Sequence, residues 1–344
     1  MLTDNSNADR QMSLASMGWS DFFAAQFDDN DAGLAPMRIA SVHRARMSAI
    51  SPTGPIRLML PVHANTGDYA VGDWVLVEPA THLLRRRLKR KTVLQRHIEG
   101  GKGPQLAGAN VDTLFIVTSC NADFNAARLE RYLVLANESG AKPVILLTKA
   151  DLVDDASPFQ QQAAALQRDL AVVTLNPRIG EAIDDLAPWC CAGKTVALVG
   201  SSGVGKSTLV NTLAGVDQDA PQEPGGIREH DSKGRHTTTS RSLHAIAGGG
   251  WVIDTPGMRS LHLGDSAFGI DTLFAEITEL APLCRFRDCT HQHEPGCAVQ
   301  SAVAAGTLDA DRLARWRKLS DENRSNTPVQ NGPRGASAGR AKKR

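Results

Sequence analysis

The sequence predicts a multidomain chain in which a small β-barrel, an α/β domain and a small, mostly helical domain follow one another. Between residues 37 and 93, short apolar runs alternate with turn residues, which is typical of a small barrel. Beyond residue 109, longer apolar runs alternate with helical patterns, as in a parallel sheet covered by helices. Near the carboxyl end, three cysteines gather with histidines. A length of 344 residues also exceeds the roughly 250 residues that one core usually reaches.

The composition is that of an ordinary globular protein, with 42% hydrophobic and 22% charged residues. The chain contains no run of about 18 apolar residues, which a membrane helix needs, and residues 1–6 lack the basic and then apolar order of a secretory signal. We therefore expect a cytoplasmic protein with no membrane partner. The six cysteines are too sparse for a disulfide scaffold, and their clustering favours a metal site.

Shifts in composition indicate the domain limits. Residues 1–35 carry six aspartates and one arginine without sustained periodicity, which predicts a disordered acidic tail. Residues 323–344 are rich in small and basic residues, which predicts a disordered basic tail. Between these tails we expect the barrel over 36–98, the α/β domain over 99–272 and the helical domain over 273–322.

The α/β domain begins with two buried runs, residues 114–117 and 144–147, separated by a helical pattern over 126–139. Asn125 is suited to cap this helix and Gly140 to end it. Strand, helix and strand in succession indicate a parallel sheet. The remaining expected elements are strands at 171–174 and 195–199, a helix at 206–214, and a hairpin with strands at 242–247 and 251–254.

A glycine-rich turn lies between the strand that ends near residue 199 and the helix that follows. Such a turn leaves backbone N–H groups pointing inward at a helix amino terminus, where partial positive charge favours phosphate. Lys206 is placed to reach the β and γ phosphates of a nucleotide, and the Ser207 hydroxyl to bind Mg²⁺. The expected phosphate loop consists of Gly200, Ser201, Ser202, Gly203, Val204, Gly205, Lys206, Ser207 and Thr208.

Two further segments have the residues that a site for Mg²⁺ and phosphate needs. Asp254 ends the second hairpin strand, so its carboxylate can hold Mg²⁺ through water while the Gly257 N–H senses the γ phosphate. Upstream, the polar loop 234–239 is suited to supply a second hydroxyl to Mg²⁺. We assign this hydroxyl to Thr238 from its distance to Asp254 along the chain, and the threonines on either side of it remain alternatives.

The choice of base depends on the segment Thr148-Lys149-Ala150-Asp151, which follows a buried run. Guanine offers two donors, N1–H and the 2-amino group, that one carboxylate can accept together, and Asp151 is placed to do so. The Lys149 stem is placed to cover the base. GTPases usually have Asn where this chain has Thr148, which removes an amide. Asp151 disfavours the alternative of an ATPase or kinase, although an Asp after a strand also serves as a helix cap.

Three thiolates and an imidazole form a closed tetrahedral set suited to one structural zinc ion. They belong to Cys284, Cys289, His291 and Cys297. Four protein ligands leave no open position for catalysis. His293 is the alternative nitrogen ligand. The cysteines outside this set are expected to have structural roles: Cys120, Cys190 and Cys191.

Basic residues gather in two places. The stretch 85–91 puts six cations into seven positions near the end of the predicted barrel, and a short basic helix is expected at 312–319. A strand divides neighbouring side chains between two faces, so we expect only some of the cations at 85–91 to contact phosphates. A charged edge that discourages strand pairing is the alternative. Aromatic residues make up 5% of the chain, which favours recognition of folded RNA through phosphates over base stacking.

The base-reading segment precedes the phosphate loop by about fifty residues, whereas GTPases usually have the reverse order. The elements still form one site if the sheet is circularly permuted, which a fold tolerates when its old termini lie close together. In this order and in its motifs the chain resembles the ribosome small subunit-dependent GTPase A family. The resemblance covers roughly residues 36–300 and rests on the segments 110–112, 123–125, 148–151, 200–209, 234–239, 254–258 and the cysteine cluster.

The resemblance implies an oligonucleotide-binding (OB-like) barrel, a circularly permuted GTPase domain and a zinc domain. It also implies that GTP hydrolysis to GDP serves assembly of the small ribosomal subunit and is stimulated by that subunit, with its rRNA as a partner. Asn176 resembles the loop residue that supports the base. We expect a monomer away from the ribosome. An RNA-binding scaffold in which the nucleotide is only a ligand is the remaining alternative.

Many GTPases orient the attacking water with a Gln directly after an Asp-x-x-Gly motif, and Met258 occupies that position here. A thioether neither accepts a proton nor orients water strongly, so we expect very slow intrinsic turnover that a partner accelerates. His236, beside Thr238 in the sequence, is the candidate for positioning the water. The alternative is an exposed loop histidine without a role in hydrolysis.

Overall fold

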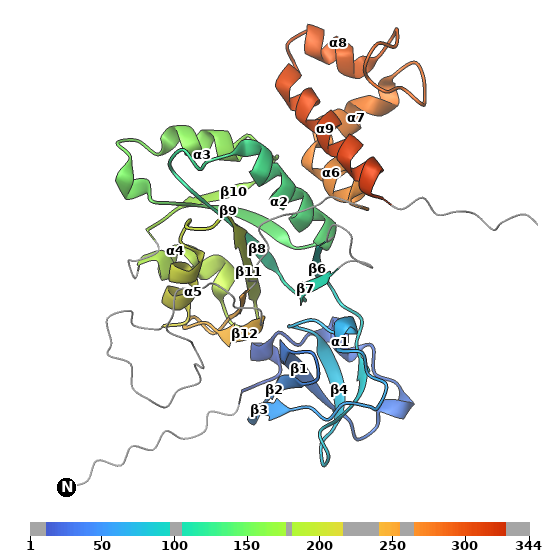
Figure 1. Ribbon diagram of the computed structural model, residues 1–344, viewed down its shortest axis with the longest axis vertical. Helices are drawn as coiled ribbons and strands as arrows, with labels where there is room; N and C mark the ends of the chain where they lie inside the picture. Colours follow the sequence, from blue (N-terminus) through green and yellow to red (C-terminus); the bar gives the residue numbers. More distant parts are fainter. Residues whose placement is uncertain (1–11, 97–104, 177–180, 216–240, 255–264, 328–344) are drawn as a thin grey trace, which may run out of the picture.

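The computed structural model describes residues 12–96, 105–176, 181–215, 241–254 and 265–327. Three bodies follow one another along its length (Figure 1): a barrel at one end, an α/β domain in the middle and a helical domain at the other end. This succession agrees with the fold class that the sequence predicts. Among the described residues, none of the helices is long and apolar enough to cross a membrane.

The amino-terminal segment folds against the barrel. Met17 and Phe23 are buried, and the Trp19 ring lies 4.8 Å from the ring of Trp74. The disordered tail expected for 1–35 is therefore wrong from residue 12 onward, because a few apolar side chains outweigh the acidic composition. The short helices of this segment are η1 (Ala15–Met17), α1 (Asp21–Ala24) and η2 (Asp29–Asp31).

The barrel consists of strands that enclose their own apolar core. β1 pairs with both β2 and β4, β2 pairs with β3, and β4 pairs with β5. A bridge between Met59 and Leu83 joins the segment after β3 to β5 and closes the ring. Ile39, Val75 and Leu84 are buried inside it. The elements are β1 (Ala35–Val42), β2 (Met47–Ser51), β3 (Gly54–Arg57), η3 (Thr66–Asp68), β4 (Trp74–Glu78) and β5 (Leu83–Arg87).

A two-stranded sheet that the sequence analysis does not predict follows the barrel. β6 (Val93–Arg96) and β7 (Gln105–Ala109) pair antiparallel. Leu94 and Ala107 belong to the same buried cluster as Leu114 of the α/β domain. The small sheet therefore packs with the α/β domain.

The α/β domain is a sheet in the order β10-β9-β8-β11-β13-β12. Neighbouring strands are parallel except β12, which runs antiparallel to β13. β11 comes late in the chain but lies between β8 and β13, which is the permuted order that the sequence predicts. The strands are β8 (Thr113–Ser119), β9 (Lys142–Thr148), β10 (Ala171–Thr174), β11 (Thr195–Gly200), β12 (Ser242–Ala245) and β13 (Trp251–Asp254).

Helices cover both faces of this sheet. Along β8, Leu114 and Ile116 pack in a cluster with α2, whereas Phe115 and Val117 pack in a second cluster with α4 and α5. Alternate side chains of the strand therefore face opposite helical layers. The helices are α2 (Ala126–Ser139), η4 (Ala150–Leu152), α3 (Ser157–Ala164), α4 (Glu181–Cys190) and α5 (Lys206–Leu213).

The helical domain ends with a helix longer than predicted. α9 extends beyond 312–319 on both sides, and residues 323–326, which we assigned to a disordered tail, are helical. That assignment is wrong for these residues because Asn323 Oδ1 accepts the Ser266 N–H at 2.8 Å and holds the last turn in place. The helices are α6 (Ala267–Leu273), α7 (Ala275–Leu280), η5 (Ala281–Leu283), α8 (Ala298–Ala304) and α9 (Ala310–Asn326).

Two buried arginines tie the middle domain to its neighbours. Arg38 of β1 donates to Thr195 Oγ1 of β11 and to the Met17 carbonyl, both at 2.7 Å. Burial lowers the pKa of Arg38 to about 10, so it stays charged at neutral pH. At the other end, Arg312 of α9 donates to Glu130 of α2 at 3.0 Å, and both side chains are buried. The three bodies are thus joined through specific polar contacts.

Candidate functional site

The phosphate loop connects the carboxyl end of β11 to the amino end of α5. Gly200 ends the strand with φ 144°, and Gly203 and Gly205 have φ 78° and 97°. A Cβ on Gly200 would lie 2.2 Å from the Val117 carbonyl oxygen of β8, so no side chain has room there. The glycines therefore let the chain turn tightly over β8 before Lys206 begins α5.

Lys206 lies back over the loop that precedes it. Its Nζ donates to the Gly200 carbonyl at 2.8 Å and also to the Ser201 carbonyl. The amino end of α5 adds partial positive charge at the same place. Ser207 is exposed and Thr208 is half-buried. The loop thus combines a cation, a helix amino end and an accessible hydroxyl, which suits an anionic ligand.

Asp254 ends β13, the strand next to β11. Because the carboxyl ends of parallel strands meet at one edge of a sheet, Asp254 and the phosphate loop share that edge. Burial raises the pKa of Asp254, while the charges of His244 and Lys206 oppose this shift. An acidic oxygen, a lysine and a hydroxyl therefore lie at one edge of the sheet, a combination that suits Mg²⁺ and phosphate.

Thr148 connects the base-reading segment to the phosphate loop. It ends β9 and is fully buried, with its hydroxyl 2.8 Å from the Val204 carbonyl oxygen and 3.1 Å from that of Thr118. The Thr148 side chain thus faces the loop. Lys149 adopts φ 57°, and Asp151 is exposed in η4.

The strand order places most of the expected site at one edge. Asn176 follows β10, the base-reading segment follows β9 and the phosphate loop follows β11, and these strands run parallel. The expected site residues that lie outside the described residues are His236, Thr237, Thr238, Thr239, Gly257 and Met258. Their placement stays a prediction.

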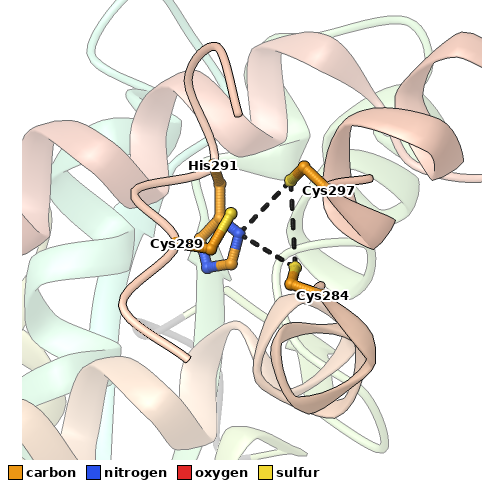
Figure 2. Close-up of side chains that lie close together, drawn as sticks. All are labelled: Cys284, Cys289, His291 and Cys297. Carbon is orange, nitrogen blue, oxygen red and sulfur yellow. Dashed lines mark hydrogen bonds between the residues drawn. The ribbon is translucent and has the colours of Figure 1, made fainter. Parts of the chain in front are cut away.

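The cysteine and histidine cluster lies around the loop between η5 and α8 (Figure 2). The ligand atoms of Cys284, Cys289, His291 and Cys297 lie within 4.8 Å of one another. His291 Nδ1 lies 3.5 Å from the sulfurs of Cys284 and Cys297, which are 3.9 Å apart. Tetrahedral zinc needs about 3.6 Å between N and S and about 3.8 Å between two S atoms. The cluster fits zinc, and a disulfide would need its sulfurs about 2.05 Å apart.

Neighbouring side chains hold the loop that carries these four side chains in this shape. Glu294 accepts the backbone N–H groups of Thr290 at 2.8 Å and Gln292 at 3.0 Å. Gln300 Nε2 donates to the His291 carbonyl at 2.6 Å. Burial lowers the pKa of His291, which favours the neutral imidazole that binds metal. Sequence reasoning missed Glu294 and Gln300, although an acidic residue between the last two ligands was an available signal.

The remaining histidine and cysteines lie outside this cluster. His293 is exposed and lies outside the group of close ligand atoms, so the geometry favours His291 as the nitrogen ligand. Cys120 and Cys190 are buried, and Cys191 is exposed. Burial raises the pKa of Cys190 to about 12, which keeps this thiol protonated at neutral pH.

Comparison with known proteins assigns this arrangement to a family. The model of the RsgA GTPase family matches residues 87–264, which is more than half of the chain. The chain belongs to the RsgA GTPase family. The resemblance seen in the sequence motifs is thereby confirmed.

Relatives in the RsgA family match nearly the whole chain. The small ribosomal subunit biogenesis GTPase RsgA of Mesorhizobium japonicum is 73% identical over 334 residues, 96% of each chain. RsgA 2 of Vibrio vulnificus is 47% identical over 91% of this chain and 88% of its own. The crystal structure of YjeQ from Thermotoga maritima superposes with a TM-score of 0.61 at 25% identity, covering 84% and 98% of the two chains. YloQ, described as a circularly permuted GTPase, has a TM-score of 0.62 at 24% identity, covering 88% and 99%, and confirms the permuted fold.

Proposed function

We propose that this chain hydrolyses GTP to GDP and phosphate, and that the reaction serves late assembly of the small ribosomal subunit. The contact between Thr148 and the Val204 carbonyl carries the proposal, because it joins the base-reading strand to the phosphate loop despite their permuted order. Relatives that are 73% and 47% identical are named small ribosomal subunit biogenesis GTPases. Membership in the RsgA GTPase family supports the same reaction.

The phosphate loop, residues 200–208, binds the nucleotide phosphates through its backbone N–H groups and the amino end of α5. Lys206 leaves the loop carbonyls and reaches the β and γ phosphates. Mg²⁺ neutralises phosphate charge when bound, and its protein ligands are Ser207, Thr238 and, through water, Asp254. The edge of the sheet that Ser207, Lys206 and Asp254 share supports this assignment.

Guanine is recognised at the carboxyl ends of β9 and β10. The carboxylate of Asp151 accepts the N1–H and 2-amino groups, the Lys149 stem covers the base, and the Asn176 backbone supports it. Thr148 lacks the amide that GTPases usually have here, but its hydroxyl still contacts the loop. Recognition of guanine therefore depends chiefly on Asp151.

Hydrolysis is slow until a partner organises the site. Met258 cannot orient the attacking water, so His236 takes this role. The Gly257 N–H donates a hydrogen bond to the γ phosphate. Both groups lie close in sequence to the Mg²⁺ ligands Thr238 and Asp254. Docking on the small ribosomal subunit brings His236 to the water and raises the rate.

The zinc ion has a structural role. All four coordination positions of a tetrahedral ion are filled by protein ligands, which leaves none for substrate. The ligands are Cys284, Cys289, His291 and Cys297. We propose the zinc domain at 265–327, the GTPase domain at 93–254, and the OB-like barrel with its amino-terminal segment at 12–92. These limits replace 273–322, 99–272 and 36–98 from the sequence, because α6 begins at Ala267 and β6 packs with the α/β domain. The barrel and zinc domain lie at opposite ends of the GTPase domain (Figure 1), an arrangement that lets both touch one large partner.

The exposed cations of 85–91 contact rRNA phosphates. Arg86 and Arg90 donate to aspartates of the same chain at 2.8 Å and 2.6 Å, so they stabilise the barrel. Arg87 and Lys89 are exposed and take the phosphate contacts.

The protein acts in the cytoplasm, where subunits are assembled, and it is a monomer away from the ribosome.

Nucleotide and subunit binding test this function together. A fluorescent GTP analogue should bind the full chain and be displaced by GTP and GDP but not by ATP. Co-sedimentation with purified small subunits should be stronger with a non-hydrolysable GTP analogue than with GDP, and should weaken steeply as salt rises. Displacement by ATP as effective as by GTP, or equal subunit affinity with both guanine nucleotides, would contradict the proposal.

A further inference from the structure

Arg128 lies beside the phosphate loop, although the function proposed above gives it no role. It occupies the first turn of α2, where Asn125 Oδ1 accepts its backbone N–H at 2.9 Å. Its guanidinium donates from Nη1 to Ser201 Oγ at 2.6 Å and from Nη2 to the Asp123 carbonyl at 3.0 Å. One planar group therefore links the start of α2 to the second residue of the phosphate loop.

The position is electrostatically unfavourable unless an anion binds nearby. A cation in the first turn of a helix faces the partial positive charge of the helix amino end. Lys206 and Arg128 both contact Ser201, at a loop that also begins α5. This concentration of positive charge becomes favourable when nucleotide phosphates lie against the loop. Packing does not explain the residue, because buried Leu129 and Leu133 attach α2 to the sheet.

Lys206 and Arg128 hold Ser201 in different ways. Lys206 donates to the Ser201 carbonyl, whereas Arg128 donates to the Ser201 hydroxyl. Lys206 must leave the Ser201 carbonyl to reach the β and γ phosphates, whereas the contact between Arg128 and the Ser201 hydroxyl does not depend on Lys206. We propose that Arg128 is a positioning residue for GTP hydrolysis, which through Ser201 keeps the outer turn of the phosphate loop aligned with the γ phosphate. This inference rests on the function proposed above.

If Arg128 has a positioning role, its loss should change kcat much more than the affinity for GDP. The backbone N–H groups and Lys206 still hold the β phosphate of GDP when Ser201 is less constrained. The γ phosphate is then less well aligned with the attacking water, so kcat falls. The affinity for GDP stays within about twofold of the wild-type value. A lysine in place of Arg128 offers a cation without the planar fork and restores only part of the rate.

The test uses the full chain with Arg128→Ala, Arg128→Lys, Ser201→Ala and the Arg128→Ala/Ser201→Ala double variant. Arg128→Ala should lower kcat for GTP about 10- to 100-fold, and Ser201→Ala should lower it by a similar factor. The double variant should lose no more than either single variant, because the two residues act as one unit. Arg168→Ala, which removes an exposed arginine paired with Glu279, is the matched control and should keep the kcat of the wild type.

Thermal unfolding monitored by circular dichroism checks that each variant is folded. If Arg128→Ala does not fold, Arg128→Lys and Ser201→Ala carry the comparison. The inference would be overturned if kcat were unchanged in Arg128→Ala, or if the losses in the double variant were additive. It would also be overturned if the GDP dissociation constant rose by the same factor as kcat fell. In each case the wild type would still hydrolyse GTP. Absence of GTP turnover by the wild type, with and without small subunits, would overturn the proposed function instead.

Discussion

The side chain of Thr148 connects two parts of the site that lie far apart in the sequence. Its hydroxyl is fully buried and lies 2.8 Å from the Val204 carbonyl oxygen of the phosphate loop. An Asn at this position would bring an amide, and the hydroxyl of Thr148 keeps a contact to the loop in its place. Because Thr148 faces the loop, we expect recognition of guanine to depend on Asp151, which is exposed in η4.

Replacing Thr148 by Val should weaken both the fold and the site. The variant leaves the Val204 carbonyl without this donor inside the protein, which should lower the free energy of unfolding by about 1–3 kcal/mol and weaken GTP binding. Urea denaturation and titration with fluorescent GTP measure the two effects. Thr148→Ser keeps the hydroxyl and serves as the control. A loss in Thr148→Ser without a loss in Thr148→Val would show that the methyl group, and not the hydroxyl, matters.

Asp151→Asn should change the choice of base. A neutral amide no longer accepts both donors of guanine, and losing a hydrogen bond to a charged group costs about 1.5–3 kcal/mol, at least tenfold in GTP affinity. Xanthine has a carbonyl in place of the 2-amino group, so the Asn amide should bind xanthosine triphosphate better than Asp151 does. Competition against fluorescent GTP measures both affinities. Asp154→Asn is the control, and an equal loss of GTP affinity there would contradict the role of Asp151.

At the scale of secondary-structure elements, α2 shows which features are predictable. The sequence predicts both ends of α2, because Asn125 caps it and Gly140 ends it with φ 78°. The same reasoning missed the short helices of residues 12–34, which a few irregularly spaced apolar residues hold to the barrel. It also missed the β6–β7 pair, although Gly100-Gly101 and Gly103-Pro104 between the two strands are typical turn signals. Local signals thus predicted elements with clear caps, and long-range packing decided the others.

Helix α2 also joins the phosphate loop to the zinc domain. Glu130, two positions after Arg128, is buried and accepts from Arg312 at 3.0 Å and from Arg315 at 2.8 Å. Glu130→Ala should lower the free energy of unfolding by about 1.5–3 kcal/mol, because Arg312 loses this buried carboxylate but keeps its ion pair with Glu276. Hydrogen exchange should then rise across α9. Arg324→Ala, on the exposed side of α9, should leave exchange unchanged, and an unaltered α9 in Glu130→Ala would contradict the coupling.

Removal of one thiolate tests the metal site. Cys289→Ser should lower the zinc content from about one ion per chain, because a tetrahedral structural site needs all four of its ligands. Hydrogen exchange around α8 should rise as the loop loses its anchor. Inductively coupled plasma mass spectrometry measures the metal, with exposed Cys191→Ser as the control. Unchanged zinc in Cys289→Ser would sink the assignment.

At the scale of the whole molecule, the circular permutation decides how the domains are connected. The chain leaves β13 at Asp254 and continues to the zinc domain, and the barrel contacts the same sheet, since Ser41 of β1 pairs with Ser242 of β12. Ser242 in turn pairs with Asp254. The motifs alone predicted this order and the zinc cluster. The contacts between domains, such as those of Arg38 and Arg312, bring together residues too distant in sequence to be paired by pattern.

GTP turnover with and without purified small ribosomal subunits is the most direct test of a subunit-stimulated GTPase. We expect very slow hydrolysis by the free chain and a rise of about 100-fold or more at saturating subunits, with the rise diminishing as salt increases. His236→Ala should abolish the rise and leave GTP affinity nearly unchanged. Equal turnover with and without subunits would show that the small subunit does not stimulate this GTPase.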